Sequence, residues 1–463
     1  MELAAALRAA GGGRVLVPGE DGFDAQLQVF DLTTSVVPDV VVAATGTADV
    51  RAAIEVAAAR GVPLAVLGTG HGMLRDVAGG ILLTTRGLAG VAVDRAARTA
   101  RIGAGTTWSE VLAATAPYGL AGLCGSAPGV GVIGYLLGGG LGPLGRSHGY
   151  AADHVRSIEI VTPAHGPITA TAEDHAELFW ALRGGKGGFG VVTAVTIDLF
   201  PIASVYGGGL YFGDGDAAAV LDAFAGWAPA LPESVTASVA LLRLPPLPVL
   251  PEPIRGRFVV HLRVASLDAP ARAEELLAPM RAAGSPLLDA VGVLPVTAIG
   301  AIHSDPTEPM PADSASATLT AFGADAVAAL LEVAGPGVEL PLAAVEVRAL
   351  GGALARQPEI PNAVGARDAA ANLFLAGAPV PGLGATAIPR AVDSVLDAMR
   401  PWTGPHYLAN FVGRANAPDA IDHAWDAAQR ERLDGVRAAA DPGGLFPFAG
   451  HGRRQAGLSS LGC

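Results

Sequence analysis

Apolar and polar positions in the first part of the chain follow two different periods, which predicts both strands and helices. Residues 38–67 contain two short apolar runs, DVVVAA and LAVL, on either side of a stretch with helical periodicity. We expect a βαβ order here, with a strand at 39–44, a helix at 47–60 that Thr47 can N-cap, and a strand at 64–67. Short β-rich runs joined by tight turns follow between residues 81 and 103.

A capping box and then a glycine-rich segment interrupt this pattern. Residues 107–110, TWSE, have the spacing of a capping box and predict a helix that ends near residue 116. From residue 119 to 149 glycine is so frequent that a continuous helix or strand would be weak, so this segment is suited to wrap a ligand. Beyond it we expect a strand, a helix and a strand, at 156–162, 176–182 and 191–200.

Residues 205–404 show a different pattern, in which longer strand candidates alternate with helical runs. The strand candidates are YGGGLYFG, VTASVALLRL, RFVVHLRVA and LAAVEVRAL, and residues 268–282 form one of the helical runs. This pattern predicts an antiparallel sheet backed by helices. Together with the first half, it places the chain in the α+β class.

Composition narrows the kind of protein and the kind of partner. Of the 463 residues 51% are hydrophobic, yet Gly, Pro or charge interrupts each apolar stretch before the ~20 residues that a membrane helix requires. The N-terminus lacks the features of a secretory signal, so we expect a cytoplasmic protein without a membrane partner. A formal net charge of −13 argues against a nucleic-acid partner. Two cysteines and no complete ligand set predict neither a disulfide framework nor a metal site.

Two glycine-rich motifs carry candidate chemistry. Residues 129–134, GVGVIG, match G-x-G-x-x-G, but GLCGSAP precedes them where a dinucleotide-binding fold requires a strand, and Pro143 lies where its helix would run. The motif therefore gives only weak support to a nicotinamide-dependent dehydrogenase. Residues 67–72, LGTGHG, follow a predicted strand, and their small side chains would let backbone amides face an anion. His71 would then face a cofactor, although a surface or structural histidine fits the same letters.

Four segments together resemble the FAD-linked oxidases of the berberine bridge enzyme and vanillyl-alcohol oxidase family. They are PDVVVAATGTADVRAAIEVAAARGVPLAVLGTGHG, VDRAARTARIGAGTTWSEVL, APGVGVIGYLLGGGLGPLGRSHGYAADHV and AELFWALRGGKGGFGVVTAVTIDLFP, and DPGGLFPFAGH is similar to the closing motif of this family. The resemblance covers residues 38–201 and 405–451. It implies a two-part FAD-binding domain of the PCMH type, residues 1–204 and 405–463, with a substrate domain at 205–404.

The resemblance also implies how FAD is held. His71 matches the histidine that bonds covalently to the flavin 8α-methyl group. The other positions that it assigns to the cofactor are Gly68, Thr69, Gly70, Gly72, Ala127, Gly131, Val132, Gly134, Gly138, Gly139, Gly190, Val191 and Asn410. Relatives with a second covalent link have cysteine where this chain has Ala127. We therefore expect a link through His71 only and a buried, unlinked thiol at Cys124, with a shifted attachment at Cys124 as the alternative.

Three features depart from the family pattern or bear on its chemistry. Thr69 and Gly188 stand where relatives often have Gly and Asn. The closing Tyr-x-Asn element is one residue too long here, which makes Asn410 a safer flavin contact than Tyr407. The small Val132 falls where the family sets access to the flavin edge, so the resemblance favours molecular oxygen as electron acceptor.

Catalytic residues are the least defined part of the prediction. The family transfers a hydride to flavin N5 while a Tyr, Glu or His removes a proton from the substrate. Glu346 and Arg348 share one face of a predicted strand by period two, so we expect Glu346 as proton acceptor and Arg348 as an orienting or anion-stabilising group. A solvated face on an edge strand is the alternative. Tyr211 and Tyr407 are further candidates, with core packing or a surface hydroxyl as the alternative for Tyr211.

Taken together, the sequence predicts an FAD-dependent oxidoreductase, in the role of an oxidase, that acts on a small organic molecule. An alcohol, hemiacetal or amine-like carbon would be oxidised, and the substrate itself stays open, as does the oligomeric state. The alternative from another class is a flavin-fold protein that binds or sequesters a small hydrophobic compound without turnover.

Overall fold

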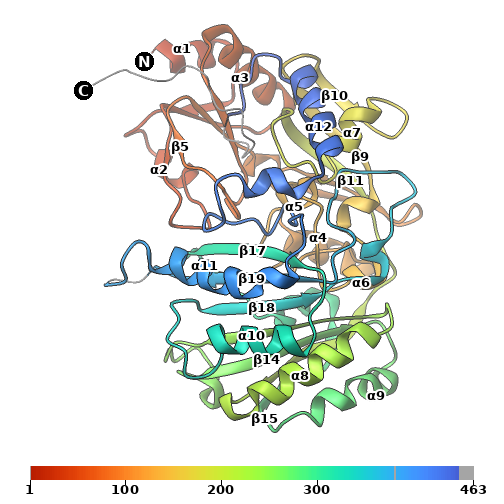
Figure 1. Cartoon of the computed structure of the whole chain (residues 1–463). Coiled ribbons are helices and arrows are strands. Elements are labelled where there is room, and N and C mark those ends of the chain that lie inside the picture. The colour runs from red at the N-terminus through yellow and green to blue at the C-terminus, as the bar shows by residue number, and fades with distance from the viewer. Residues whose placement is uncertain (1, 380–381, 448–463) are drawn as a thin grey trace.

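Four β-sheets organise the residues that the computed structural model describes, 2–379 and 382–447, and three of these sheets lie in the first 200 residues (Figure 1). The first has the order β1 (Arg14–Leu16), β3 (Val40–Ala43), β6 (Ile81–Thr84) and β4 (Leu64–Leu67). β3 and β4 both run parallel to β6, and α3 (Thr47–Arg60) connects them. The predicted βαβ opening is confirmed. Beside it lie α1 (Glu2–Ala9), α2 (Phe23–Gln26) and the pair β2 (Val36–Val37) and β5 (Val77–Ala78).

The start of α3 differs from the prediction by one residue. Gly46, and not Thr47, occupies the N-cap position. The Asp49 carboxylate accepts hydrogen bonds from the backbone N–H groups of Thr45 and Gly46 at 2.8 and 3.2 Å. A glycine has no side chain with which to cap, so the acidic residue in the first turn satisfies these donors instead.

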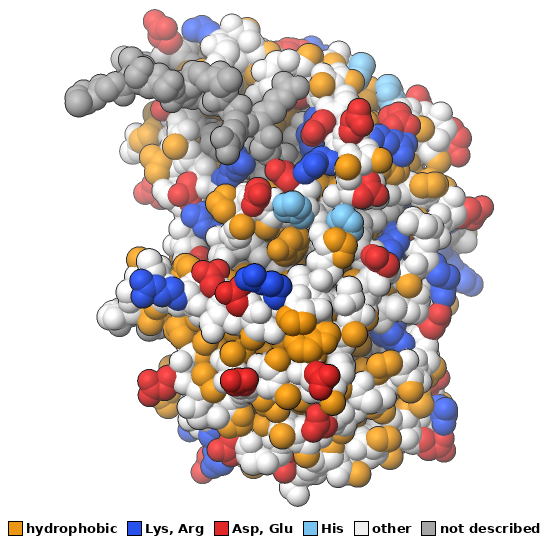
Figure 2. Space-filling model, in the orientation of Figure 1, with side chains coloured by type: hydrophobic (Ala, Val, Ile, Leu, Met, Phe, Trp, Pro, Cys, Tyr) orange, Lys and Arg blue, Asp and Glu red, His pale blue; other side chains and the backbone are white. Residues whose placement is uncertain are grey.

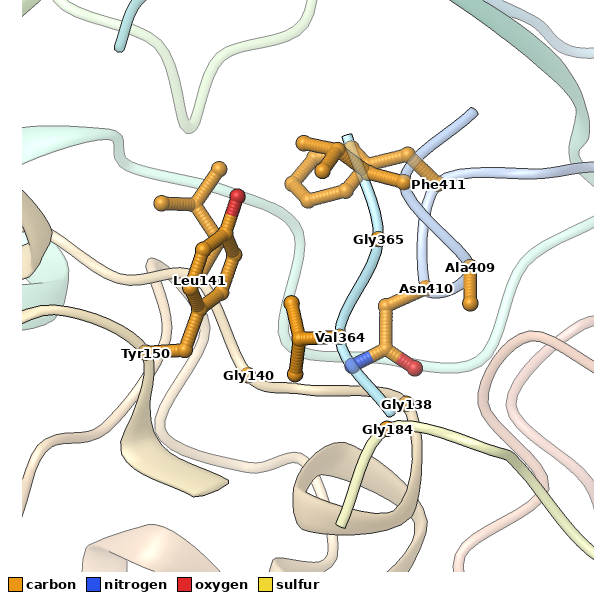
Figure 3. Close-up of a pocket in the computed structure, with 11 residues that line it drawn as sticks. Gly138, Gly140, Leu141, Tyr150, Gly184, Val364, Gly365, Ala409, Asn410 and Phe411 are labelled. Carbon is orange, nitrogen blue, oxygen red and sulfur yellow. The ribbon is translucent and has the colours of Figure 1, made fainter. Parts of the chain in front are cut away.

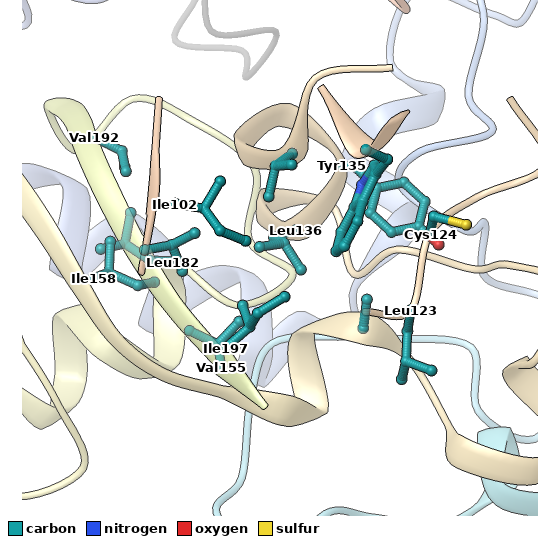
Figure 4. Close-up of a cluster of buried hydrophobic side chains, with 14 of the residues drawn as sticks. Ile102, Leu123, Cys124, Tyr135, Leu136, Val155, Ile158, Leu182, Val192 and Ile197 are labelled. Carbon is teal, nitrogen blue, oxygen red and sulfur yellow. The ribbon is translucent and has the colours of Figure 1, made fainter. Parts of the chain in front are cut away.

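The second sheet is antiparallel and packs on the glycine-rich segment. Its order is β10 (Gly166–Ala170), β9 (Val155–Thr162), β11 (Val191–Asp198), β8 (Thr99–Gly103) and β7 (Val91–Asp94). The predicted capping box is confirmed, because the Thr107 N–H donates to Glu110 Oε2 at 2.7 Å and α4 (Trp108–Thr115) begins there. The glycine-rich segment contains only the short helices α5 (Val132–Leu137) and α6 (Gly145–His148). α7 (Ala176–Ala181) covers the far side of this core, part of which Figure 4 shows.

The third sheet forms the lower half of the molecule in Figure 1 and is antiparallel throughout. Its order is β15 (Pro286–Asp289), β12 (Ser204–Phe212), β14 (Phe258–Ser266), β13 (Val235–Arg243), β18 (Ala344–Ala349), β19 (Ala371–Gly377) and β17 (Asp313–Leu319), and β16 (Gly292–Pro295) also pairs with β12. One face packs its apolar side chains against α8 (Ala217–Trp227), α9 (Pro270–Arg281), α10 (Ala324–Ala334) and α11 (Ala387–Met399). The predicted α+β class and helix-backed sheet are confirmed.

The C-terminal part of the chain returns to the first half. α12 (Ala427–Ala440) ends where the Ala164 N–H donates to the Ala440 carbonyl at 3.1 Å, and the Leu64 N–H donates to the Leu445 carbonyl at 2.8 Å. Leu445 and Phe446 then complete the core around the first sheet. The end of the DPGGLFPFAGH motif and Cys463 lie outside the described residues.

The surface is consistent with the acidic, mixed composition. Figure 2 shows acidic and basic side chains scattered over one face, with a band of hydrophobic side chains between α11 and α10. Within the described ranges, no helix has both the length and the apolar character needed to cross a membrane.

Candidate active site

The His71 loop connects β4 to β5 and depends on two glycines. Gly70 and Gly72 have φ angles of 76° and 63°, a left-handed conformation that side chains other than glycine rarely adopt. A Cβ on Gly70 would also lie 2.7 Å from Val29 Cα, whereas nothing lies within 4 Å of a Cβ on Gly72. The loop is therefore packed on one side at Gly70 and open beside Gly72.

The His71 side chain is half-buried and held by an aromatic neighbour. Its ring stacks on Phe30 with 3.8 Å between ring centroids and 19° between the planes. Burial lowers the pKa of His71 to about 4. The imidazole is thus neutral at neutral pH, and one ring nitrogen keeps a free lone pair, which is the form that can act as a nucleophile.

The glycine-rich segment meets this loop although about 60 residues separate them in sequence. The Gly131 N–H points to Thr69 Oγ1 at 3.4 Å, and no atom lies within 4 Å of a Cβ built on Gly129 or Gly134. The G-x-G-x-x-G motif here precedes only the six-residue α5 and follows no named strand. A nicotinamide-binding motif would lie between a strand and a longer helix, so this structural context argues against nicotinamide binding. The two predicted cofactor segments are brought together, with open backbone between them.

Some predicted cofactor positions are occupied by core packing. Val132 and Val191 are completely buried, in the cores around the second and first sheets. A Cβ on Gly190 would lie 2.4 Å from the Val161 carbonyl oxygen, so glycine there permits β11 to approach β9. The Val132 side chain has a packing role in this structure, and its predicted role in oxygen access has no support from its position.

A first cavity lies between the glycine-rich segment and residues 408–411 (Figure 3). Asn410 lines it, but its amide is already used: Lys186 Nζ donates to Asn410 Oδ1 at 2.7 Å, and Asn410 Nδ2 donates to the Tyr135 carbonyl at 2.7 Å. A Cβ on Gly138 would lie 1.9 Å from Asn410 Oδ1. Asn410 therefore joins the C-terminal part to the glycine-rich segment, and its predicted flavin contact stays a prediction.

The surroundings of Lys186 and Tyr407 become visible only in the folded structure. Lys186 is the single lysine of the chain, and burial lowers its pKa to about 8. Nothing in the local sequence RGGKGGFG predicts that Lys186 contacts Asn410, 224 positions away. Tyr407 is half-buried and precedes the residues that line the first cavity. Its predicted catalytic role stays a prediction.

One face of the third sheet carries the candidate catalytic residues. The face opposite the helices presents two rows of side chains in register, Arg263–Ser238–Arg348–Asn372 and Tyr211–His261–Ala240–Glu346. Glu346 and Arg348 do share a face, as predicted. The alternative, a solvated edge strand, is wrong, because β18 lies between β13 and β19 and the two residues are 4% and 5% exposed.

Glu346 forms a buried ion cluster with two arginines. Its Oε1 lies 3.0 Å from Arg263 Nη1, and its Oε2 lies 3.1 Å from Arg348 Nη2. Burial alone would raise the pKa of Glu346, but the Arg348 and Arg263 guanidinium groups hold it well below its usual value. A carboxylate with a strongly lowered pKa is a weak proton acceptor, so the geometry disfavours the predicted role of Glu346 as catalytic base.

A small second cavity opens beside this cluster. Its wall combines Gly142 and Pro143 of the glycine-rich segment with the polar sheet face and with His303, which follows a short 3-10 helix (Val296–Ile302). His303 is 7% exposed, and neither ring nitrogen has a hydrogen-bond partner among the described residues. Burial, followed by the charges of Arg348 and Arg263, lowers the pKa of His303 to about 3.

Tyr211 packs on the same sheet face beside the cluster. Its ring stacks on His261 with 3.9 Å between centroids, and His261 Nδ1 lies 3.1 Å from the donating Arg263 Nε. A Cβ on Gly209 would lie 2.0 Å from His261 Nε2, so only glycine leaves room for this imidazole. Burial raises the pKa of Tyr211. Its environment fits the packing alternative better than a catalytic one.

Tyr135 and Cys124 pack together in the core around the second sheet (Figure 4). The Tyr135 hydroxyl is buried without a hydrogen-bond partner among the described residues. Burial raises the pKa of Cys124 to about 12. The thiol is therefore protonated and unreactive at neutral pH, as a buried thiol is expected to be.

Comparison with known proteins agrees with this geometry. Residues 38–171 match the FAD binding domain family. FAD-dependent monooxygenase FUP4 of Fusarium proliferatum is 38% identical over 174 residues, 37% of this chain and 34% of that protein. (R)-6-hydroxynicotine oxidase of Paenarthrobacter nicotinovorans is 32% identical over 194 residues, 41% and 42% of the two chains. The matched regions thus span well under half the length of these curated relatives.

Solved structures resemble the chain over nearly its whole length. BBE-like 1 of Physcomitrella patens superposes with a TM-score of 0.83 at 20% identity, covering 96% of this chain and 98% of that one. Glucooligosaccharide oxidase of Acremonium strictum, described with a 6-S-cysteinyl, 8α-N1-histidyl FAD, gives 0.80 at 21% identity, with coverage of 96% and 98%. Residues 38–171 thus form a PCMH-type FAD-binding domain, within a chain that has the fold of the berberine bridge enzyme-like FAD-linked oxidoreductases.

Proposed function

We propose that the protein is an FAD-dependent oxidase that removes a hydride from an alcohol, hemiacetal or amine-like carbon of a small organic substrate. The observation that carries the proposal is the position of His71, a neutral imidazole on a loop of left-handed glycines that meets a second glycine-rich segment within the FAD-binding region. We further propose a cytoplasmic location and a role in secondary metabolism.

The residues present fit FAD. Open space beside Gly72, Gly129 and Gly134 leaves backbone accessible to a flat, phosphorylated ligand, and His71 lies at the edge of that space. When bound, FAD would accept the hydride and pass its electrons to oxygen with release of hydrogen peroxide. His71 would hold it covalently, and Lys186 and Asn410 would fix the glycine-rich segment around it.

We propose one covalent link instead of the two described for the glucooligosaccharide oxidase. Ala127 has no nucleophile, and Cys124 is a fully protonated buried thiol in the hydrophobic core. The shifted attachment at Cys124 would require this thiol to leave its packing position. His71 therefore remains the single side chain proposed for attachment.

His303 is a better-placed proton acceptor than Glu346. It lines the second cavity and both of its ring nitrogens are unpartnered among the described residues, whereas both carboxylate oxygens of Glu346 are ion-paired with arginines. Its pKa is lowered as well, to about 3, so the advantage of His303 over Glu346 is a free nitrogen facing the cavity and not a higher basicity. Its Nε2 lies 3.7 Å from Glu346 Oε1, so an imidazolium formed during the reaction would have a counter-charge beside it. We propose that His303 accepts the substrate proton and that Glu346 stabilises the charged form.

The relatives and structures described above are oxidases, a monooxygenase and a BBE-like protein, which favours turnover over binding without reaction. The test uses purified protein precipitated with acid. We expect a yellow precipitate and a single flavin-bearing peptide that contains His71, while His71→Ala releases its FAD or does not load it. A colourless wild-type precipitate would show that FAD is not bound covalently. A purified protein that contains no flavin would refute the proposed function.

A further inference from the structure

We infer that the substrate carries a carboxylate, which binds beside Arg263 and Arg348 in the second cavity. The inference rests on the proposed function, because it names the substrate class of that same site. Arg263 lies on β14 and Arg348 on β18, and Ser238 of β13 stands in register between them. Both guanidinium groups and Ser238 line the cavity, together with His303.

The first reason is an unbalanced charge. Arg263 and Arg348 bring two positive charges into a region where each is at most 6% exposed, and Glu346 is the one carboxylate within ion-pair distance of either among the described residues. His261 and His303 do not add charge, since burial lowers both of their pKa values. The two guanidinium groups thus share one ion-paired carboxylate, and the next negative charge, Asp305, acts on His303 and Tyr211 without pairing with either arginine. Two buried cations with one paired carboxylate favour a further anion beside them.

The second reason is the supply of free hydrogen-bond donors. Arg263 donates through Nε to His261 and pairs through Nη1 with Glu346, and Arg348 uses Nε and Nη2 on the same carboxylate. Within the described residues, Arg263 Nη2 and Arg348 Nη1 have no hydrogen-bond partner. Guanidinium groups match the geometry of a carboxylate, which can accept from both.

The third reason is a neighbouring amide without a partner. Asn372 pairs with Arg348 in the strand register and is completely buried, yet neither atom of its amide group makes a hydrogen bond among the described residues. A buried amide without partners is rare in folded proteins unless a ligand or water satisfies it. The row of polar side chains therefore continues past Arg348, and it carries unsatisfied hydrogen-bonding groups next to the arginines.

The charge balance favours a monoanion. A single carboxylate would neutralise the excess of +1, whereas a phosphate ester with nearly two negative charges would overshoot it. Gly142 and Pro143 line the same cavity as the arginines, so the carboxylate would lie near the segment that we assign to FAD. The remainder of the substrate would extend from that point.

The test compares two probes of equal shape, benzoate and the neutral benzamide, on the yellow holoprotein. Binding is followed by calorimetry and by the change in the flavin absorbance spectrum. We expect benzoate to bind at least about tenfold more tightly than benzamide, which corresponds to one charge-assisted hydrogen bond. Equal binding of both probes, or no binding of benzoate, in a yellow, folded protein would overturn the inference.

Variants separate a binding role from a folding role. Arg348→Gln should weaken benzoate binding by about 10- to 100-fold, and Arg348→Lys should retain part of it. Glu346→Gln raises the excess charge, so benzoate should bind about tenfold more tightly, a gain that a folding defect cannot produce. Arg356→Gln, which alters an exposed arginine, is the matched control and should leave binding unchanged. Weaker benzoate binding in a Glu346→Gln protein that is yellow and folded by circular dichroism would contradict the inference.

The outcomes also distinguish this inference from the proposed function. If the purified protein carries no flavin but benzoate still binds with the stated dependence on Arg348, the proposed function fails and the anion site stands. If the protein is yellow and covalently flavinylated but does not discriminate benzoate from benzamide, the proposed function stands and the anion site fails.

Discussion

Replacing Glu346 by Gln tests the energetic role of the buried ion cluster directly. The side chain is 4% exposed and contacts Arg263 and Arg348 at 3.0 and 3.1 Å, so the magnitude for buried pairs applies in place of the 0–1 kcal/mol typical of surface pairs. Removing the carboxylate leaves two buried guanidinium groups without a counter-charge. We expect a loss of about 3–5 kcal/mol in the free energy of unfolding at pH 7.

The pH dependence gives the sign of this effect. Because the folded-state pKa of Glu346 lies well below its usual 4.5, the carboxylate stabilises the fold above about pH 4.5, and this contribution is lost as the pH falls towards the folded-state pKa. The stability difference between wild type and Glu346→Gln should therefore shrink in acid.

Urea denaturation of both proteins at several pH values measures this difference. Glu233→Gln, which breaks the exposed ion pair with Arg356, is the control and should cost at most about 1 kcal/mol. Equal stability of wild type and Glu346→Gln at pH 7 would show that the cluster does not stabilise the fold.

Three further predictions concern the flavin loop, the buried thiol and the proton acceptor. Gly70→Ala should strongly reduce FAD loading, because its Cβ would lie 2.7 Å from Val29 Cα in a left-handed conformation; the flavin-to-protein absorbance ratio measures this, and normal loading would contradict it. Cys124 should not react with a thiol reagent at pH 7 until the protein is denatured, since burial raises its pKa to about 12; rapid labelling of the native protein would show an accessible thiol. His303→Ala should slow anaerobic flavin reduction by about 10²–10⁴ with normal FAD loading, and stopped-flow reduction at the wild-type rate would exclude His303 as the base.

Local sequence patterns predicted most of the secondary structure because their periods are local. α3 spans the predicted residues, β4 lies where the LAVL run placed it, and the capping box at Thr107 forms as expected. The left-handed glycines beside His71 were likewise signalled by their own letters. In each case the chemistry that determines the conformation lies within a few residues of the position concerned.

The site depended on contacts that no local pattern contains. The period-two spacing placed Glu346 and Arg348 on one face, but only strand register brought Arg263 from β14 to the same carboxylate and turned a candidate base into the centre of an ion cluster. His303 reaches the cavity from the end of a short 3-10 helix, which no local pattern placed beside the sheet.

The C-terminal part shows the same limit. Asn410 was predicted from a motif, but only the tertiary structure shows that Lys186, 224 residues earlier, donates a hydrogen bond to it. The sequence therefore determined which elements form and predicted a glycine-rich loop around His71, because backbone periodicity and glycine conformations act locally. The tertiary structure decided which charges meet, since burial and ion pairing depend on residues that are distant in the chain.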